Sequence, residues 1–140
     1  MRTDETGPAD AGELADVAIP FGSAAPSAAR TVIDRCLAGR VASSVLEDAR
    51  LLMTELVTNS VRHSGGTEDD FVIVRVHHWR DMCRLEVEDP GSDEVIAPRP
   101  SDLASGSGMG LNIVQMLSER WGVVRAAEGP TRVWAQLSCT

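Results

Sequence analysis

The chain has 140 residues, 43% of them hydrophobic, which is the length and composition of one globular domain with its own core. Acidic residues outnumber basic ones by 21 to 13, and the formal charge of −8 argues against nucleic acid or an anionic membrane as a partner. All 13 basic residues are Arg, so the absence of Lys excludes a Walker-type phosphate loop and Schiff-base chemistry.

Three further features indicate an intracellular protein. No apolar run approaches the length of a membrane span. Residues 1–13 are acidic, lack the regions of a signal peptide and are expected to form a disordered tail before a single domain at 14–140. The three cysteines (Cys36, Cys83 and Cys139) lie far apart in the chain, which predicts reduced structural thiols without a metal site or a disulfide framework. We therefore expect a cytoplasmic protein.

The first half of the chain contains one strand pattern and two helix patterns. Alternating residues predict a strand over 14–21. Apolar residues spaced three or four apart predict a helix over 26–40 and a longer helix that starts at Ser43 or Ser44, with a capping-box signal there. The longer helix should end at the turn over 64–66.

The second half contains four strand patterns, one helix pattern and one long loop without periodicity. In chain order these are expected at 71–78 (strand), 83–89 (strand), 90–108 (loop), 109–120 (helix), 122–128 (strand) and 131–138 (strand). Helices combined with strands that are mostly linked as hairpins predict an α+β two-layer sandwich. Its sheet should be mixed but mostly antiparallel, with the helices on one face.

The strand that ends at Asp89 alternates cleanly between apolar and charged residues. This pattern places Asp89 on the buried face and leaves Arg84 and Glu86 on an exposed face, and His77 on the preceding strand is also expected to be exposed. A buried carboxylate requires a hydrogen-bond donor such as an exocyclic amine. The Asp-Pro-Gly sequence at 89–91, taken alone, is equally typical of a turn.

Polar residues line one face of the long helix beside its apolar stripe. Glu55, Asn59 and His63 are spaced by four residues, and Arg62 follows Asn59 by three. A carboxylate, a carboxamide and two nitrogen bases on one face suit a site that holds a metal ion and transfers a proton. Each residue taken alone is also typical of a solvated helix face, and positive charge is favoured near a helix C-terminus.

A glycine-rich segment, Gly106-Ser107-Gly108-Met109-Gly110-Leu111, lies where the long loop meets the last helix. Glycines there let backbone N–H groups approach a phosphate, and the helix dipole favours the negative charge. The segment alone is also typical of a flexible helix cap. It does not follow a strand directly, which argues against a dinucleotide-binding fold.

The order of these three motifs resembles that of the GHKL, or Bergerat-fold, ATPase family. The stretch from Glu55 to His63 looks like its N-box, Asp89 and Gly91 like its Asp-x-Gly box, and the segment at 106–110 like its glycine-rich lid. Within that superfamily, the sequences ELVTNSVRH, WGV and VWAQL are similar to those of bacterial anti-sigma factor serine/threonine kinases. The resemblance covers about residues 14–138.

The resemblance implies ATP and Mg²⁺ as cofactors and a role for each matching residue. Asn59 would ligate Mg²⁺, Glu55 would be the general base for an attacking serine hydroxyl, and Asp89 would accept a hydrogen bond from the adenine amino group. Gly91 would leave room for the purine, and the glycines of the segment at 106–110 would wrap the phosphates. Arg62 or His63 would supply positive charge, and Thr131 would help to fix adenine. The implied nucleotide contacts besides Asn59 and Asp89 are Arg62, His63, Gly91, Gly106, Gly108, Gly110, Leu111 and Thr131.

The resemblance also implies partners. The chain would phosphorylate a serine on an anti-anti-sigma antagonist, sequester a sigma factor when the antagonist is unavailable, and form a homodimer. The alternatives are a non-catalytic module that senses nucleotide or sequesters a partner, a kinase acting on a partner's histidine, and a nucleotide-free scaffold. Retention of Glu55 favours the serine kinase, because nucleotide binding alone needs no base there. One departure is Asp93, which replaces a family glycine and is expected to weaken or reshape nucleotide binding.

Overall fold

The computed structural model describes residues 12–64, 66–91, 109–126 and 129–139. The predicted loop from residue 92 onward and almost all of the predicted N-terminal tail lie outside these residues, as does Asp93. The elements in chain order are β1 (Glu13–Pro20), α1 (Ala25–Leu37), α2 (Ser43–His63), β2 (Phe71–Trp79), β3 (Met82–Asp89), α3 (Met109–Leu117), β4 (Arg120–Arg125) and β5 (Thr131–Ser138). Every predicted helix and strand is therefore present.

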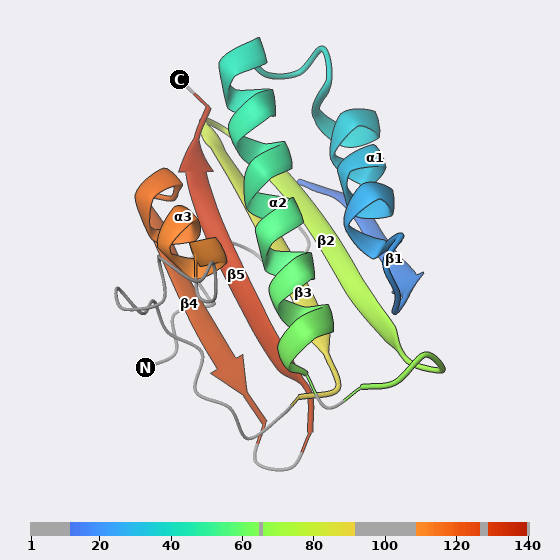
Figure 1. The fold of residues 1–140 in the computed structure, drawn as a ribbon. Helices are drawn as coiled ribbons and strands as arrows, with labels where there is room; N and C mark the ends of the chain where they lie inside the picture. The colour runs from blue at the N-terminus through green and yellow to red at the C-terminus, as the bar shows by residue number, and fades with distance from the viewer. Residues whose placement is uncertain (1–11, 65, 92–108, 127–128, 140) are drawn as a thin grey trace.

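The five strands form one sheet in the order β1-β2-β3-β5-β4. Each neighbouring pair is antiparallel, so the described sheet is fully antiparallel rather than mixed. The three helices lie on one face of this sheet, with α1 over β1 and β2, α2 over the centre and α3 beside β4 (Figure 1). The predicted α+β two-layer sandwich is confirmed.

The core lies between α2 and the sheet because both contribute apolar residues at the period of their own secondary structure. α2 buries one stripe with a helical spacing, and the central strands bury every second residue. The fully buried members include Leu52, Met53, Leu56 and Val57 of α2, Val72, Val74 and Val76 of β2, and Leu85 and Val87 of β3. Each such side chain stabilises the fold by about 1.5–3 kcal/mol relative to an exposed position. In the described residues no helix is both long and apolar enough to span a membrane.

The N-terminus of α2 differs from the prediction. The N-cap is Ala42, which has no side-chain oxygen, so the predicted capping box is wrong. The helix is stabilised instead by packing of its apolar stripe, since tertiary contacts supply most of the stability of helices in proteins.

The C-terminus of α3 also differs, because the helix ends at Leu117, three residues earlier than predicted. The Ser118 hydroxyl donates to the Val114 carbonyl, which closes the last turn. The Glu119 backbone N–H then donates to the Gln136 carbonyl of β5 at 2.8 Å. Pairing with β5 therefore begins earlier than expected, and β4 spans Arg120–Arg125 instead of 122–128.

Arg84 and Glu86 of β3 and His77 of β2 are buried, contrary to the prediction that they face solvent. The Arg84 Nε donates to the Glu86 carboxylate at 2.9 Å, and its guanidinium lies 4.6 Å from the ring centroid of Trp134. Trp134 is itself buried. The alternation rule assumes that charged residues face water, but a paired charge that also stacks on an indole can be buried.

Candidate nucleotide-binding site

Asp89 is the last residue of β3 and faces the helix layer, as predicted. It lies opposite Thr131, the first residue of β5, and both side chains are almost fully buried. The Gly91 backbone N–H donates to the Asp89 Oδ1 at 2.7 Å. The side chain of Asp89 is also hydrogen-bonded to Ser60 of α2. A buried carboxylate is therefore held at the junction of α2, β3 and β5.

Burial raises the pKa of the Asp89 carboxyl above its ordinary value. The hydrogen bonds from Ser60 and Gly91 and the positive charge of Arg125 lower this pKa, but they do not offset the loss of hydration. The carboxylate is therefore a buried hydrogen-bond acceptor at the end of β3. A neutral donor group of a ligand would gain more here than at a hydrated carboxylate.

The raised pKa of Asp89 predicts how the free energy of unfolding changes with pH. The folded chain holds the Asp89 proton to a higher pH than the unfolded chain, so this group costs stability as the pH rises above its ordinary pKa. Asp89→Asn removes that cost while keeping an oxygen that can accept from Gly91. We expect Asp89→Asn to be more stable than the wild type at about pH 8, with the difference shrinking toward about pH 4, as measured by urea unfolding. A difference that is independent of pH would contradict this assignment.

Gly91 brings the ends of β3 and β5 into close contact. Its φ is +98°, and a Cβ at this position would lie 2.4 Å from the Gly129 carbonyl oxygen and 3.3 Å from the Thr131 Oγ1. The structure therefore requires glycine here for the approach of the protein's own backbone. The predicted role in making room for a purine stays a prediction.

Gly91→Ala is accordingly expected to destabilise the fold by about 1–3 kcal/mol, because the added methyl group meets a backbone atom that cannot move freely. Gly39→Ala is a matched control, since Gly39 has a similar φ of +83° but nothing within 4 Å of the added Cβ. Urea unfolding of both variants separates the steric contact from the strain of a positive φ. Equal losses of unfolding free energy in the two variants would show that the contact with Gly129 does not contribute to the effect.

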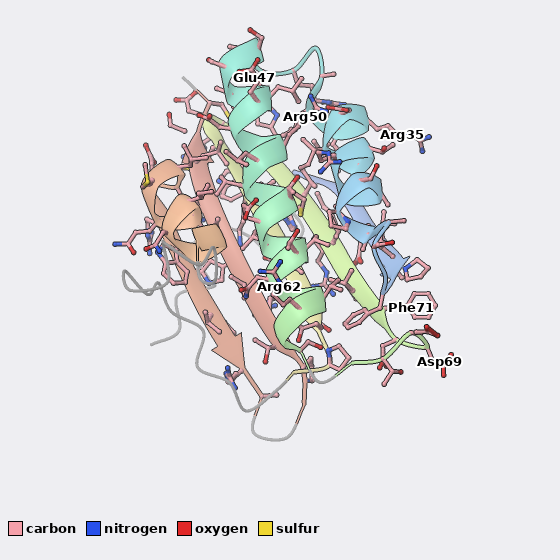
Figure 2. The ribbon with its side chains drawn as sticks, in the orientation of Figure 1. Arg35, Glu47, Arg50, Arg62, Asp69 and Phe71 are labelled. Carbon is pink, nitrogen blue, oxygen red and sulfur yellow. The ribbon has the colours of Figure 1, made fainter. Side chains whose placement is uncertain are left out.

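Glu55 and Asn59 lie one turn apart on α2, and both side chains are half-buried. Burial raises the pKa of the Glu55 carboxyl, and the positive charge of Arg62 opposes this shift. Arg62 itself is exposed near the C-terminal end of α2 (Figure 2). The predicted face of α2 therefore combines a carboxylate of raised basicity with an amide oxygen.

The remaining predicted residues are placed as follows. Thr131 lies beside Asp89 in the sheet. His63 belongs to α2, while Gly110 and Leu111 belong to α3, but their side-chain surroundings lie outside the description. Gly106 and Gly108 lie outside the described residues. The structure therefore brings together the α2 and β3 parts of the predicted site and leaves the lid untested.

Two residues were missed by the sequence reasoning. Ser60 continues the buried stripe of α2, four residues after Leu56, and a polar residue at such a position is a usable sequence signal. Arg125 of β4 pairs with Thr131 and lowers the pKa of Asp89 by its charge. No local pattern marks Arg125, because its position depends on the pairing of β4 with β5.

These residues fit a nucleotide with Mg²⁺. Asn59 offers an amide oxygen, and oxygen ligands are those that Mg²⁺ prefers, while Glu55 offers a carboxylate one turn away that can accept a proton. Asp89 offers a buried acceptor for a neutral amine, and Arg62 and Arg125 supply positive charge in a chain without Lys. When bound, the ion would neutralise phosphate charge next to Asn59.

The chain is similar to known proteins. Residues 45–140, more than half of the chain, match the family described as histidine kinase-, DNA gyrase B-, and HSP90-like ATPase. No curated protein matches the chain. A similar solved structure is the NMR structure of the histidine kinase domain of the E. coli osmosensor EnvZ, at 11% identity and a TM-score of 0.46, with 95% of this chain and 93% of that chain covered.

The family match includes the residues that form the site. It begins two residues into α2 and extends through β3, α3 and β5, so Glu55, Asn59, Asp89 and Thr131 all lie within it. Domains of this family bind ATP, generally with Mg²⁺, which are the two ligands that the site residues fit. The chain belongs to the histidine kinase-, DNA gyrase B- and HSP90-like ATPase family.

Proposed function

We propose that this ATP-binding domain is a bacterial anti-sigma factor with serine kinase activity, and that it acts as a homodimer. It uses ATP with Mg²⁺ to phosphorylate a serine on an anti-anti-sigma antagonist, and it sequesters a sigma factor when the antagonist is unavailable. Support comes from the similarity of residues 55–63, ELVTNSVRH, to such kinases. All of this stretch lies in α2, and Ser60 within it is hydrogen-bonded to the buried carboxylate of Asp89.

The environment of Glu55 is the observation that carries the kinase proposal. A general base must take a proton from a weakly acidic hydroxyl, and a pKa above the ordinary range makes a carboxylate more effective in that role. Burial raises the pKa of Glu55, which lies one turn before Asn59. A module that only binds nucleotide does not require such a base.

The proposed reaction is a direct transfer of the γ-phosphoryl group. The serine oxygen of the antagonist forms a bond to the γ-phosphorus, and the bond from that phosphorus to the bridging oxygen of ADP breaks. Glu55 accepts the hydroxyl proton, so the nucleophile does not develop a positive charge. Asp89 holds the adenine end, and Asn59 would hold the Mg²⁺ ion, which would neutralise phosphate charge.

The negative charge of the chain suggests how phosphorylation of the antagonist would change the partner that the chain binds. Phosphorylation adds about two negative charges to the antagonist at its serine. The chain carries a formal charge of −8, so the phosphorylated antagonist is repelled and released. The freed chain then binds a sigma factor through a basic surface of that protein.

The test combines γ-labelled ATP, Mg²⁺, the purified chain and a soluble extract of the bacterium that encodes it. We expect label on the serine of one small protein, dependent on the added chain and absent with Glu55→Gln. A parallel capture of the sigma factor by the tagged chain should decrease when the unphosphorylated antagonist is added. Capture of a sigma factor without any labelled protein would replace the kinase with a sequestering module.

A further inference from the structure

Two cysteines that are distant in the sequence meet at one end of the sheet. Cys83 lies in β3 directly opposite Leu137 of β5, and Cys139 follows two residues later on the same face. The Cys139 backbone N–H donates to the Asp81 carbonyl at 2.7 Å, which continues the pairing of the two strands beyond Leu137. Diagonal neighbours on one face of an antiparallel pair are close enough for their side chains to interact.

The two thiols are in direct contact. Their Sγ atoms lie 2.6 Å apart, and both cysteines are free. A disulfide bond requires a separation of about 2.05 Å, so a small rotation of the side chains brings the sulfurs to bonding distance. We propose that Cys83 and Cys139 form a reversible disulfide, a modification site that is independent of the nucleotide site.

The two thiols differ in burial, and this difference indicates which of them reacts first with an oxidant. Cys83 is fully buried, and this burial raises the pKa of its thiol. Cys139 is partly exposed at the end of β5 and is therefore the thiol that an oxidant reaches first. An exposed attacking thiol beside a buried partner is the arrangement typical of reversible redox sites.

The oxidant is a low-molecular-weight disulfide. The Cys139 thiolate attacks one sulfur of the small disulfide, forms a mixed disulfide and releases one small thiolate. Cys83 then attacks the Cys139 sulfur, which forms the protein disulfide and releases the second small thiolate. The two protons lost by Cys83 and Cys139 are taken up by the two released thiolates, so two protein thiols are oxidised and one small disulfide is reduced.

A metal site is the competing interpretation, because His78 lies opposite Cys83 in β2. The ligand atoms of His78, Cys83 and Cys139 all lie within 4.8 Å of one another. Two thiolates that share a tetrahedral Zn²⁺ with bonds of about 2.3 Å lie about 3.8 Å apart, however. The observed separation of 2.6 Å is therefore closer to that of a disulfide than to that of a zinc site.

The disulfide would join the start of β3 to the end of β5. Asp89 and Thr131 lie at the opposite ends of these same strands. Oxidation is therefore expected to raise the Tm by about 10 °C, because it restrains a long loop of the unfolded chain, without changing ATP affinity.

The experiment treats the reduced, metal-free full chain with oxidised glutathione and counts thiols by alkylation and mass spectrometry in denaturant. The wild type should lose two of its three thiols and two hydrogen atoms, retain only the Cys36 thiol, and regain the others with a reductant. Cys36→Ser is the matched control and should form the same disulfide. Cys139→Ser should lose it, and Cys83→Ser should stop at a glutathione adduct on Cys139.

Three results would overturn the proposal. In the first, the wild type retains all three thiols. In the second, it accumulates the glutathione adduct on Cys139 without forming the internal bond. In the third, the purified chain holds one equivalent of Zn²⁺ that protects both thiols, and the two thiols stay reduced in oxidised glutathione after a chelator has removed the ion, which would establish a metal site instead. Because Cys83 and Cys36 are both in the core, the decision rests on the wild type and Cys139→Ser, which leave these two buried positions unchanged.

Discussion

Glu55→Gln is expected to lower the rate of phosphate transfer by about 10²–10⁴-fold, which is the usual contribution of a general base. Glutamine keeps the size of the side chain and one oxygen acceptor but has no basicity near neutral pH. Because Glu55 is placed to accept a proton rather than to bind adenine, ATP affinity should change by less than about threefold. Steady-state phosphorylation of the antagonist, combined with calorimetric titration of ATP, measures both quantities.

Glu47→Gln provides the matched control on the same helix. Glu47 is exposed near the N-terminal end of α2, at the far end of the helix from Arg62 (Figure 2). The control removes the same charge and should leave the rate of transfer unchanged. If Glu55→Gln retained the wild-type rate, or if both variants lost activity equally, Glu55 would not be the base.

Asp89→Asn is expected to weaken ATP binding by about 10–100-fold. A hydrogen bond to a charged acceptor contributes about 1.5–3 kcal/mol, and the substitution removes the charge from an acceptor that is almost fully buried. The same variant should be more stable than the wild type at neutral pH, because burial raises the pKa of Asp89. Weaker binding by a more stable protein cannot be attributed to loss of folding.

Asp81→Asn is the control for this substitution. Asp81 is exposed and precedes β3 at the end of the strand opposite Asp89, so ATP affinity should be unchanged. Calorimetric titration with ATP and with an analogue that lacks the exocyclic amine measures the effect. Wild-type ATP affinity in Asp89→Asn, or equal loss for both nucleotides, would show that Asp89 does not contact the adenine amine.

The inward position of Asp89 and the polar face of α2 could be predicted because each depends on one local period. Alternation along β3 fixes which residues face the helices, and the spacing of Glu55 and Asn59 fixes their common face. The bond from Ser60 to Asp89 could not be predicted in the same way, since it depends on how α2 docks against the sheet.

Strand pairing accounts for the contacts that the sequence did not predict. Cys83 and Cys139 are separated by 56 positions in the sequence, and only the register of β3 with β5 brings their sulfurs together. Arg84 and Glu86 have the alternation of a solvated face, but they pair with each other and are buried. Local patterns predict the orientation of a side chain within its own element, whereas contacts between elements depend on tertiary structure.

The most direct test of the central claim is calorimetric titration of the purified chain with ATP, with and without Mg²⁺, beside Asn59→Ala. We expect binding by the wild type that depends on Mg²⁺ and is lost in Asn59→Ala, because the variant removes an oxygen ligand without changing the buried carboxylate of Asp89. Binding of equal strength in Asn59→Ala, or no binding by the wild type at millimolar ATP, would contradict the assignment of an ATP–Mg²⁺ site to this face of α2.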